Sequence, residues 1–216
     1  MKKFTILTLI SFLVFSIHSN AQIKKGTILL GGGLGFNLTE SGSSPNETSF
    51  SGFHITPSVG FVTKDNQAIG FNLFYSHAST VVSGSPYDDV KNNAYGGGVF
   101  LRRYLPVGKN FYMFGEGQAN FNYSQQTSRP NTDLQSKIMI YNGGISLYPG
   151  LAYAVNKRFH LELGLNNLVS FGYNRQEVEN VTLGGTTRTK SSGFQFSTNL
   201  STSTPFNVGF RVVLGK

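Results

Sequence analysis

The chain of 216 residues contains no cysteine. This absence excludes a disulfide framework, a thiolate metal site, a cysteine nucleophile and a lipid-anchored N-terminal cysteine. Charged residues are also scarce, at 13% of the chain against ~25% in soluble globular domains. Glycine (26), phenylalanine (19) and tyrosine (10) are abundant instead. This composition excludes intrinsic disorder, which requires high charge and few aromatic residues.

Long apolar stretches are missing as well. Beyond Ile17 no segment approaches the ~18 consecutive apolar residues of a membrane-spanning helix. The helical period of 3.6 residues is nowhere convincing. A bundle of membrane helices is therefore excluded, and the length fits one sizeable domain.

The segment Met1 to Ala21 has the features of a secretory signal peptide. Lys2 and Lys3 form a positive start, and Phe4 to Ile17 is an apolar core too short to cross a bilayer. Ser19-Asn20-Ala21 provides a small-residue cleavage site, which disfavours the alternative of an uncleaved anchor helix. We expect cleavage after Ala21, with residues 22–216 forming the exported domain. Its net charge falls from +8 to +6, because two of 18 basic residues are removed and all 10 acidic residues remain.

Apolar and polar residues alternate along most of the mature chain, which is the period of a β-strand. In the segment 111–123, Phe111 and Met113 fall on one face, while Gln118 and Asn120 fall on the other. The pattern predicts eight strands, at 27–38, 50–63, 68–80, 93–105, 110–124, 137–155, 158–171 and 194–214. Three short turns, at 64–67, 106–109 and 156–157, alternate with four long polar connections, at 39–49, 81–92, 125–136 and 172–193.

This alternation of short and long connections predicts a transmembrane barrel. Because lipid offers no hydrogen-bond partner to the backbone, a sheet in a membrane must close on itself. Such barrels have short periplasmic turns, long outer loops, apolar outer faces and polar inner faces. We therefore predict an all-β fold, an eight-stranded antiparallel up-and-down barrel in the outer membrane of a Gram-negative cell. A secreted β-sandwich or lipocalin-like barrel is the soluble alternative.

The placement of aromatic residues favours the membrane barrel. They recur near strand ends on the apolar faces, as expected for two interfacial girdles. These residues are Phe36, Phe53, Phe61, Tyr75, Tyr95, Phe111, Tyr123, Tyr141, Tyr153, Phe159, Phe171 and Phe206. Small residues lie on the opposite faces, where a narrow lumen has little room: Gly31, Gly33, Gly35, Gly96 and Gly98.

The chain resembles the small outer-membrane β-barrel family of the eight-strand OmpA-barrel and OmpX type. The resemblance covers the mature chain and is carried by two strand–turn–strand segments, Leu101 to Glu116 and Tyr148 to Glu162. Family members commonly end in an aromatic residue that the barrel-assembly machinery recognises. Here the last strand alternates correctly but ends in Gly215-Lys216. After the eight predicted strands we expect no peptidoglycan-binding domain of the OmpA kind.

Four charged residues lie within strands on inward faces: Arg102, Glu116, Glu162 and Arg211. The strand order lets Arg102 meet Glu116 and lets Arg211 meet Glu162. Since lone charges in a narrow lumen are costly, we predict a paired structural plug rather than a gated pore. His160 shares a face with Glu162, but no third ligand is evident, so we predict no metal site and no cofactor.

One enzymatic hypothesis comes from His77-Ala78-Ser79, which places a histidine and a serine on one lipid-facing side. Lipid A deacylases of the outer membrane use such a pairing, but no orienting acid is evident here. We therefore predict a non-enzymatic barrel with a structural or surface-interaction role. The alternatives are a lipid A-modifying enzyme and a small-solute transport barrel.

The expected partners follow from the export and the fold. They are outer-membrane lipid and lipopolysaccharide, the assembly machinery during insertion, and a surface protein bound through the loops at 125–136 and 172–193. Basic residues outnumber acidic ones 10 to 3 at the turn end, which favours contact with phospholipid headgroups. We predict a monomer that binds no nucleic acid.

Overall fold

The computed structural model describes residues 22–43, 46–82, 89–129, 135–165, 168–182, 184–198 and 206–215. The predicted signal peptide, 1–21, lies outside these ranges. The strands are β1 (Ile28–Ser43), β2 (Asn46–Lys64), β3 (Gln67–Val82), β4 (Asp89–Pro106), β5 (Phe111–Arg129), β6 (Gln135–Ala154), β7 (Phe159–Leu165), β8 (Val169–Thr182), β9 (Gly185–Thr198) and β10 (Phe206–Leu214). Within the described ranges no helix is long and apolar enough to cross a bilayer.

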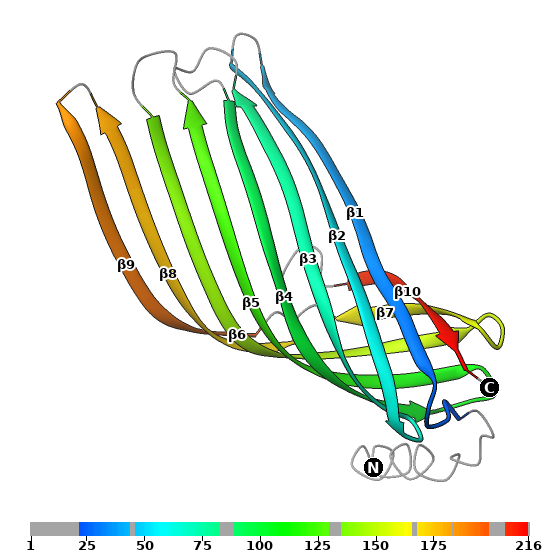
Figure 1. The fold of residues 1–216 in the computed structure, drawn as a ribbon. Coiled ribbons are helices and arrows are strands. Elements are labelled where there is room, and N and C mark those ends of the chain that lie inside the picture. The colour runs from blue at the N-terminus through cyan, green and yellow to red at the C-terminus, as the bar shows by residue number, and fades with distance from the viewer. Residues whose placement is uncertain are drawn as a thin grey trace, which may run out of the picture.

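Eight of the strands form a closed antiparallel ring toward the turn end, and β8 and β9 continue the sheet from β6 toward the other end (Figure 1). Neighbours follow the order β1–β2–β3–β4–β5–β6–β7–β10, and β10 pairs with β1 to complete the circuit. The predicted eight-stranded meander barrel is thereby confirmed. The seam between β1 and β10 is short, running from Ile28 opposite Leu214 to Gly32 opposite Phe210.

The seventh and eighth strands differ from the prediction. A continuous strand over 158–171 and a long loop over 172–193 are both wrong. The seventh strand is interrupted between Leu165 and Val169, and 172–193 lies largely within a β8–β9 hairpin that turns between Thr182 and Gly185. The predicted strand at 194–214 is likewise divided between β9 and β10.

A register shift explains the interruption. Along β6, Gly150 lies opposite Gly164 and Leu147 lies opposite Val169. Three steps on β6 thus match five on the partner, so the pairing of β8 with β6 is displaced by two residues relative to that of β7. The hairpin escaped sequence analysis because β9 is exposed along almost its whole length and lacks an apolar face to alternate with a polar one.

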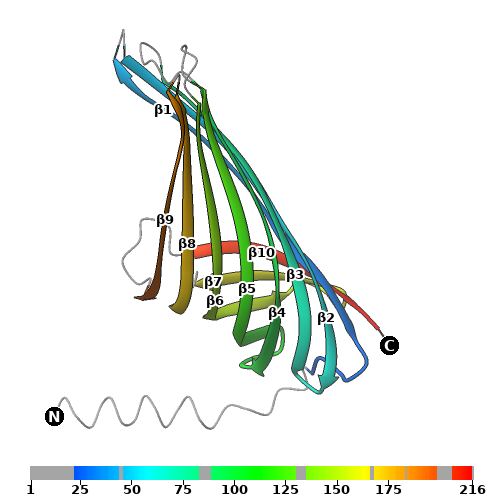
Figure 2. The ribbon, with the colours of Figure 1, turned by 60° about the vertical axis from the view of Figure 1, so that its left-hand side comes forward.

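The interruption divides the barrel into two halves. The turn end carries the turns at 64–67, 106–111 and 154–159, and the outer end is opposite. Figures 1 and 2 show β7 and β10 only toward the turn end, while β1 and β9 border the outer part of the sheet. Among the described residues, the recorded pairing of β9 is with β8, and residues 33–43 of β1 pair with β2. Each therefore has one strand edge without a described neighbour.

The outside of the barrel is an apolar band bordered by aromatic rows. Tyr75, Tyr95, Tyr123 and Tyr141 follow one another across β3, β4, β5 and β6 in register. Near the turn end, ring contacts join Phe111 to Tyr153 at 4.7 Å and Phe159 to Phe210 at 6.1 Å.

The spacing of these rows fits a bilayer. Tyr123 and Phe111 are 12 positions apart on β5, which at ~3.4 Å per residue and ~45° of tilt gives about 29 Å of height. This matches the apolar band of outer-membrane barrels. Of the predicted girdle residues, the side chain of Phe206 lies outside the described part of the chain.

Inside the barrel, bulky side chains lie flat over glycines of the neighbouring strand. A Cβ atom added at any of five glycines would overlap the side chain of the residue directly opposite. The pairs are Gly35 with His54, Gly70 with Phe100, Gly96 with Asn122, Gly98 with Asn120, and Gly150 with Phe114. The absence of a Cβ therefore lets these side chains fit into a narrow lumen.

The hydrophobic core lies at the turn end, beneath the lumen. Ile23 joins it from below, because its backbone exchanges hydrogen bonds with Asn66 at 3.0 and 2.9 Å. Asn66 adopts φ of 60°, a left-handed conformation that asparagine tolerates in tight turns. The core comprises Ile23, Leu29, Val62, Ala68, Tyr104, Tyr112, Phe114 and Ala152. The segment at 22–27 thus closes the turn end of the barrel.

Candidate functional site

The four charged residues singled out in the sequence meet in the lumen. Arg102 comes from β4, Glu116 from β5, Glu162 from β7 and Arg211 from β10, and all four side chains are buried. Arg102 lies directly opposite Glu116 in register. Arg211 lies opposite His160 and reaches the next inward residue, Glu162.

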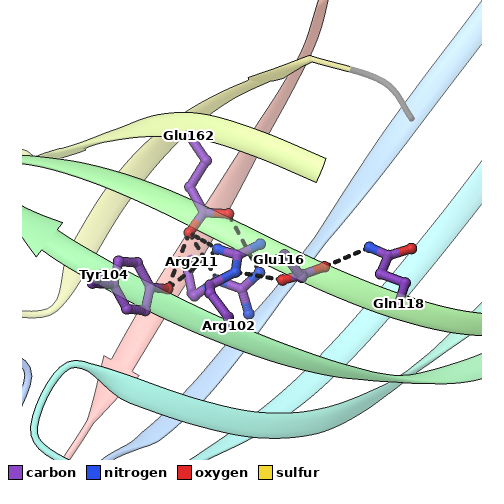
Figure 3. Close-up of polar contacts among 6 residues, drawn as sticks. All are labelled: Arg102, Tyr104, Glu116, Gln118, Glu162 and Arg211. Atoms are coloured by element: carbon purple, nitrogen blue, oxygen red, sulfur yellow. Dashed lines mark hydrogen bonds and ion pairs between the residues drawn. The ribbon is translucent and has the colours of Figure 1, made fainter. Parts of the chain in front are cut away.

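Both expected ion pairs are present, and a third connects them (Figure 3). Arg102 Nε donates to Glu116 Oε2, and Arg211 Nε donates to Glu162 Oε1 at 2.8 Å. Arg102 Nη1 also donates to Glu162 Oε1 at 2.6 Å. This last contact spans the lumen between β4 and β7, which are not neighbours in the ring. The two pairs are therefore one network.

Neutral side chains extend this network in both directions. Tyr104 Oη accepts a hydrogen bond from Arg102 Nη1 at 3.2 Å, and Gln118 Nε2 donates to Glu116 Oε1. Asn120 Nδ2 in turn donates to Gln118 Oε1 at 2.9 Å. We call the six residues in Figure 3 the lumen network: Arg102, Tyr104, Glu116, Gln118, Glu162 and Arg211.

Sequence reasoning missed Tyr104, Gln118 and the ring of Phe114, over which the Arg102 guanidinium lies at 4.1 Å. Strand periodicity could have identified all three. Each lies two positions from Arg102 or Glu116, so its side chain points to the same inward face. The contact from Arg102 to Glu162 had no sequence signal. It depends on how the closed ring brings β4 and β7 together across the lumen.

The lumen network has no net charge, because two arginines face two glutamates. In a site shielded from water, such mutual pairing offsets the cost of burying each charge. Next to the four charged side chains, the Tyr104 ring of this network contacts the rings of Tyr112 and Phe114, in edge or tilted geometry, with each pair of centroids 6.1 Å apart. Together the ions and rings fill the lumen at the turn end.

Above this plug the lumen is open. A central cavity of about 590 Å³ has the lumen network as its floor, and a side cavity of about 350 Å³ lies along β5, β6, β8 and β9. The two share Asn120 and Asn122. The lumen is therefore filled at the turn end and forms a polar cavity, here called the chamber, above the lumen network.

The two weaker hypotheses concern histidines. His160 stacks on Tyr112 at 5.6 Å, and among the described residues no group of three His, Cys, Asp or Glu side chains surrounds a possible metal position. His77 accompanies Phe53 on the outer face, with ring centroids 6.0 Å apart, and its Nδ1 contacts Asn93 Oδ1 at 2.8 Å. No carboxylate is recorded beside His77 within the described strands.

Comparison with known proteins identifies the fold. No protein-family profile and no curated protein matches the chain. The crystal structure of the outer membrane protein OprG from Pseudomonas aeruginosa superposes with a TM-score of 0.53 at 13% identity, over 89% of this chain and 98% of OprG. The ferric yersiniabactin uptake receptor FyuA from Yersinia pestis aligns over 73% of this chain and 26% of its own at 15% identity, with a TM-score of only 0.36.

The likeness to OprG shows the fold of a small outer-membrane β-barrel, as the sequence predicts. The apolar outer surface agrees, since Leu34, Phe36 and Leu38 expose 61%, 80% and 82% of their area. A soluble monomer rarely tolerates so large a contiguous apolar surface. The soluble sandwich and lipocalin-like alternatives are therefore excluded.

Proposed function

We propose that the chain is a non-enzymatic, non-conducting barrel of the cell outer membrane that interacts with other surface molecules through its outer end. The observation that carries this proposal is the contrast between the two halves of the barrel. The turn half is filled by buried ion pairs and aromatic rings, whereas the outer half extends beyond the tyrosine row. Within this proposal the leader is removed after Ala21 and the barrel functions as a monomer.

The filled base argues against passage of solutes. The solvent-exposed fraction is 2% for Arg102, 4% for Glu116 and 1% for Tyr104. The salt bridge between Arg102 and Glu162 crosses the lumen. A water-filled path would need these groups to separate, and each would then lose its buried partner.

The outer end offers the surface for interaction. On β5, residues 124–129 continue past the tyrosine row, which adds ~20 Å along the strand and about 14 Å of height. The β8–β9 hairpin carries exposed ion pairs, Arg175 with Glu177 at 2.6 Å and Arg188 with Glu179 at 3.1 Å. Its β9 edge presents backbone donors and acceptors, and such edges pair with strands of other proteins.

Two measurements test the proposal. In planar lipid bilayers the refolded barrel should give no conductance steps, and neither should Arg103→Ala, whose side chain is exposed. A double variant, Arg102→Ala with Glu162→Ala, should give steps, because it empties the centre of the plug. Conductance by the unaltered chain would instead support the transport alternative.

The second measurement removes the hairpin without disturbing the ring. Replacing 176–191 with Asn-Gly joins Arg175 to Ser192, which lie opposite each other in register, through a two-residue turn. We expect this variant to lose binding to intact cells of the parent strain in a nanodisc pull-down, while the plug variant keeps it. Unchanged binding would contradict the surface role. Altered lipid A in mass spectra of a deletion strain would support the enzymatic alternative.

A further inference from the structure

The side chains around the central and side cavities show which ligand the upper lumen suits. Apart from the charged residues of the floor, the polar side chains that line them are neutral amides and hydroxyls, with one histidine, His54. The amides and hydroxyls include Ser58, Asn72, Asn122, Asn142, Ser146 and Gln195. Each amide or hydroxyl can both donate and accept a hydrogen bond. The lining therefore complements a ligand whose groups also do both.

Several of these side chains have no hydrogen-bond partner among the residues that the structure describes. For Ser58, Asn72, Asn122 and Ser146, the described part of the chain supplies no hydrogen-bond partner, although all four line a cavity. Other amides are already engaged, as where Asn174 Nδ2 donates to Asn142 Oδ1 at 2.6 Å. The unengaged groups come from β2, β3, β5 and β6. These strands belong to the continuous stretch of sheet from β2 to β6, so the unengaged groups share one side of the chamber.

The floor does not select for charge. Arg102 and Arg211 are both engaged by Glu162, and Glu116 pairs with Arg102. Within the described lining, these four residues are the carriers of formal charge, and their charges cancel. An ionic ligand would lose its hydration without gaining a counter-charge. The chamber therefore favours a neutral ligand.

Aromatic rings provide the remaining contact type. Phe74, Phe100 and Tyr148 line the central cavity. A ligand with polar edges and an apolar face can pack that face on a ring while its edges bond to amides. A pyranose ring has this shape and chemistry. The cavity, about 590 Å³, falls within the ~300–1,000 Å³ typical of small-molecule pockets.

From this lining we propose that the upper lumen binds a neutral oligosaccharide unit, held above the lumen network and unable to pass it. The sugar could be a free oligosaccharide from the medium or the glycan part of lipopolysaccharide. The chemistry of recognition is the same for both. Recognition depends on Asn72 and Asn122 as hydrogen-bonding groups and not on residues 176–191, the outer part of the β8–β9 hairpin, which line neither cavity. It is therefore separate from the surface role proposed above.

The test is calorimetric titration of the refolded mature chain in a detergent without a sugar headgroup. The probes are maltotriose, N,N′-diacetylchitobiose and a neutral O-antigen oligosaccharide released from lipopolysaccharide, with glucose 6-phosphate and a neutral tripeptide as comparison ligands. We expect binding of at least one of the three neutral glycans. Binding of the O-antigen oligosaccharide alone assigns the sugar to lipopolysaccharide, and binding of the others assigns it to a free source.

Variants identify the site. Asn72→Leu and Asn122→Leu should each weaken binding about tenfold, the loss expected for one hydrogen bond. Ser58→Trp should abolish binding by filling the chamber. The matched control is Asn180→Leu, which changes an exposed asparagine of β8 outside both cavities. Circular dichroism establishes that each variant is folded.

Three results would overturn the proposal. The first is no binding of any glycan by the folded chain. The second is tighter binding of glucose 6-phosphate or the tripeptide than of the three glycans. The third is glycan binding that Asn72→Leu, Asn122→Leu and Ser58→Trp leave unchanged, since the sugar would then lie elsewhere on the barrel.

Discussion

The lumen network makes a quantitative prediction about Arg102. This side chain pairs with Glu116 and Glu162, donates to Tyr104 at 3.2 Å and lies over Phe114 at 4.1 Å. Replacing it with glutamine leaves two buried glutamates with one arginine. Because breaking a buried pair leaves an uncompensated charge, Arg102→Gln should lower the free energy of unfolding by about 3–5 kcal/mol.

The double variant separates pairing from simple loss of contacts. Arg102→Gln with Glu116→Gln removes one charge of each sign, and Glu162 keeps Arg211 at 2.8 Å. The lumen is neutral again, so the remaining cost is that of weakened hydrogen bonds, about 1–2 kcal/mol in total. The double variant should therefore be more stable than Arg102→Gln alone.

Unfolding is measured by urea titration in detergent micelles. Since the chain has no tryptophan, far-UV circular dichroism and the gel mobility of folded and unfolded forms report the transition. Arg103→Gln is the matched control, because Arg103 is adjacent and exposed, and its effect should stay within about 0.5 kcal/mol. If the double variant loses the sum of the single losses, the charges are not coupled and the plug is not held by their pairing.

Three further predictions follow from other contacts. Gly150→Ala places a methyl group against the Phe114 ring and the Leu163 carbonyl and should cost about 1–3 kcal/mol in the same urea titration, whereas Gly115→Ala, which has open space, should be neutral. Ile23→Ala removes a side chain that is 4% exposed; a loss of about 2–5 kcal/mol is expected, and a loss below about 0.5 kcal/mol would show that Ile23 does not seal the base. Hydrogen bonding from Arg175, followed by the charge of Lys190, lowers the pKa of Glu177 beyond the tyrosine row from its ordinary 4.5. The ion pair should therefore stabilise the β8–β9 hairpin fully above pH 4.5, and this stabilisation should be lost as the pH falls through the lowered pKa. Hydrogen exchange of the backbone amides over 169–198, corrected for the intrinsic exchange rate, would detect the loss. Slower exchange on acidification would contradict this prediction.

The sequence predicted the barrel because alternation is a local property. Each of β1 to β6 has an apolar outer face and an inner face that is rich in polar residues or glycine over much of its length, so its period of two is visible without neighbours. The pairing of Arg102 with Glu116 could be predicted for the same reason, since both strands join at a short turn that fixes their register. The strand ends were placed several residues short, because the outer ends of β1 and β2 are rich in serine, threonine and asparagine, which also favour loops.

Features that depend on non-local geometry could not be predicted. The two-residue displacement in register between β7 and β8 depends on how both strands pair with β6, which no single strand reveals. The contact of Arg102 with Glu162 requires ring closure, and the docking of Ile23 requires the turn at Asn66 to lie beneath the lumen. Sequence reasoning therefore identified the charged residues of the site and missed how they connect across the lumen.

The glycines beneath bulky side chains also restrict how this barrel can vary. At Gly98 and Asn120, as at Gly150 and Phe114, the space that one residue gives up is the space its partner occupies. Neither position can change size alone, but the two can exchange, because an asparagine on β4 over a glycine on β5 fills the same volume from the other side. Among homologous barrels such positions should therefore covary in pairs across neighbouring strands. The pairs would reveal strand register in a sequence alignment even where overall identity is too low to show it.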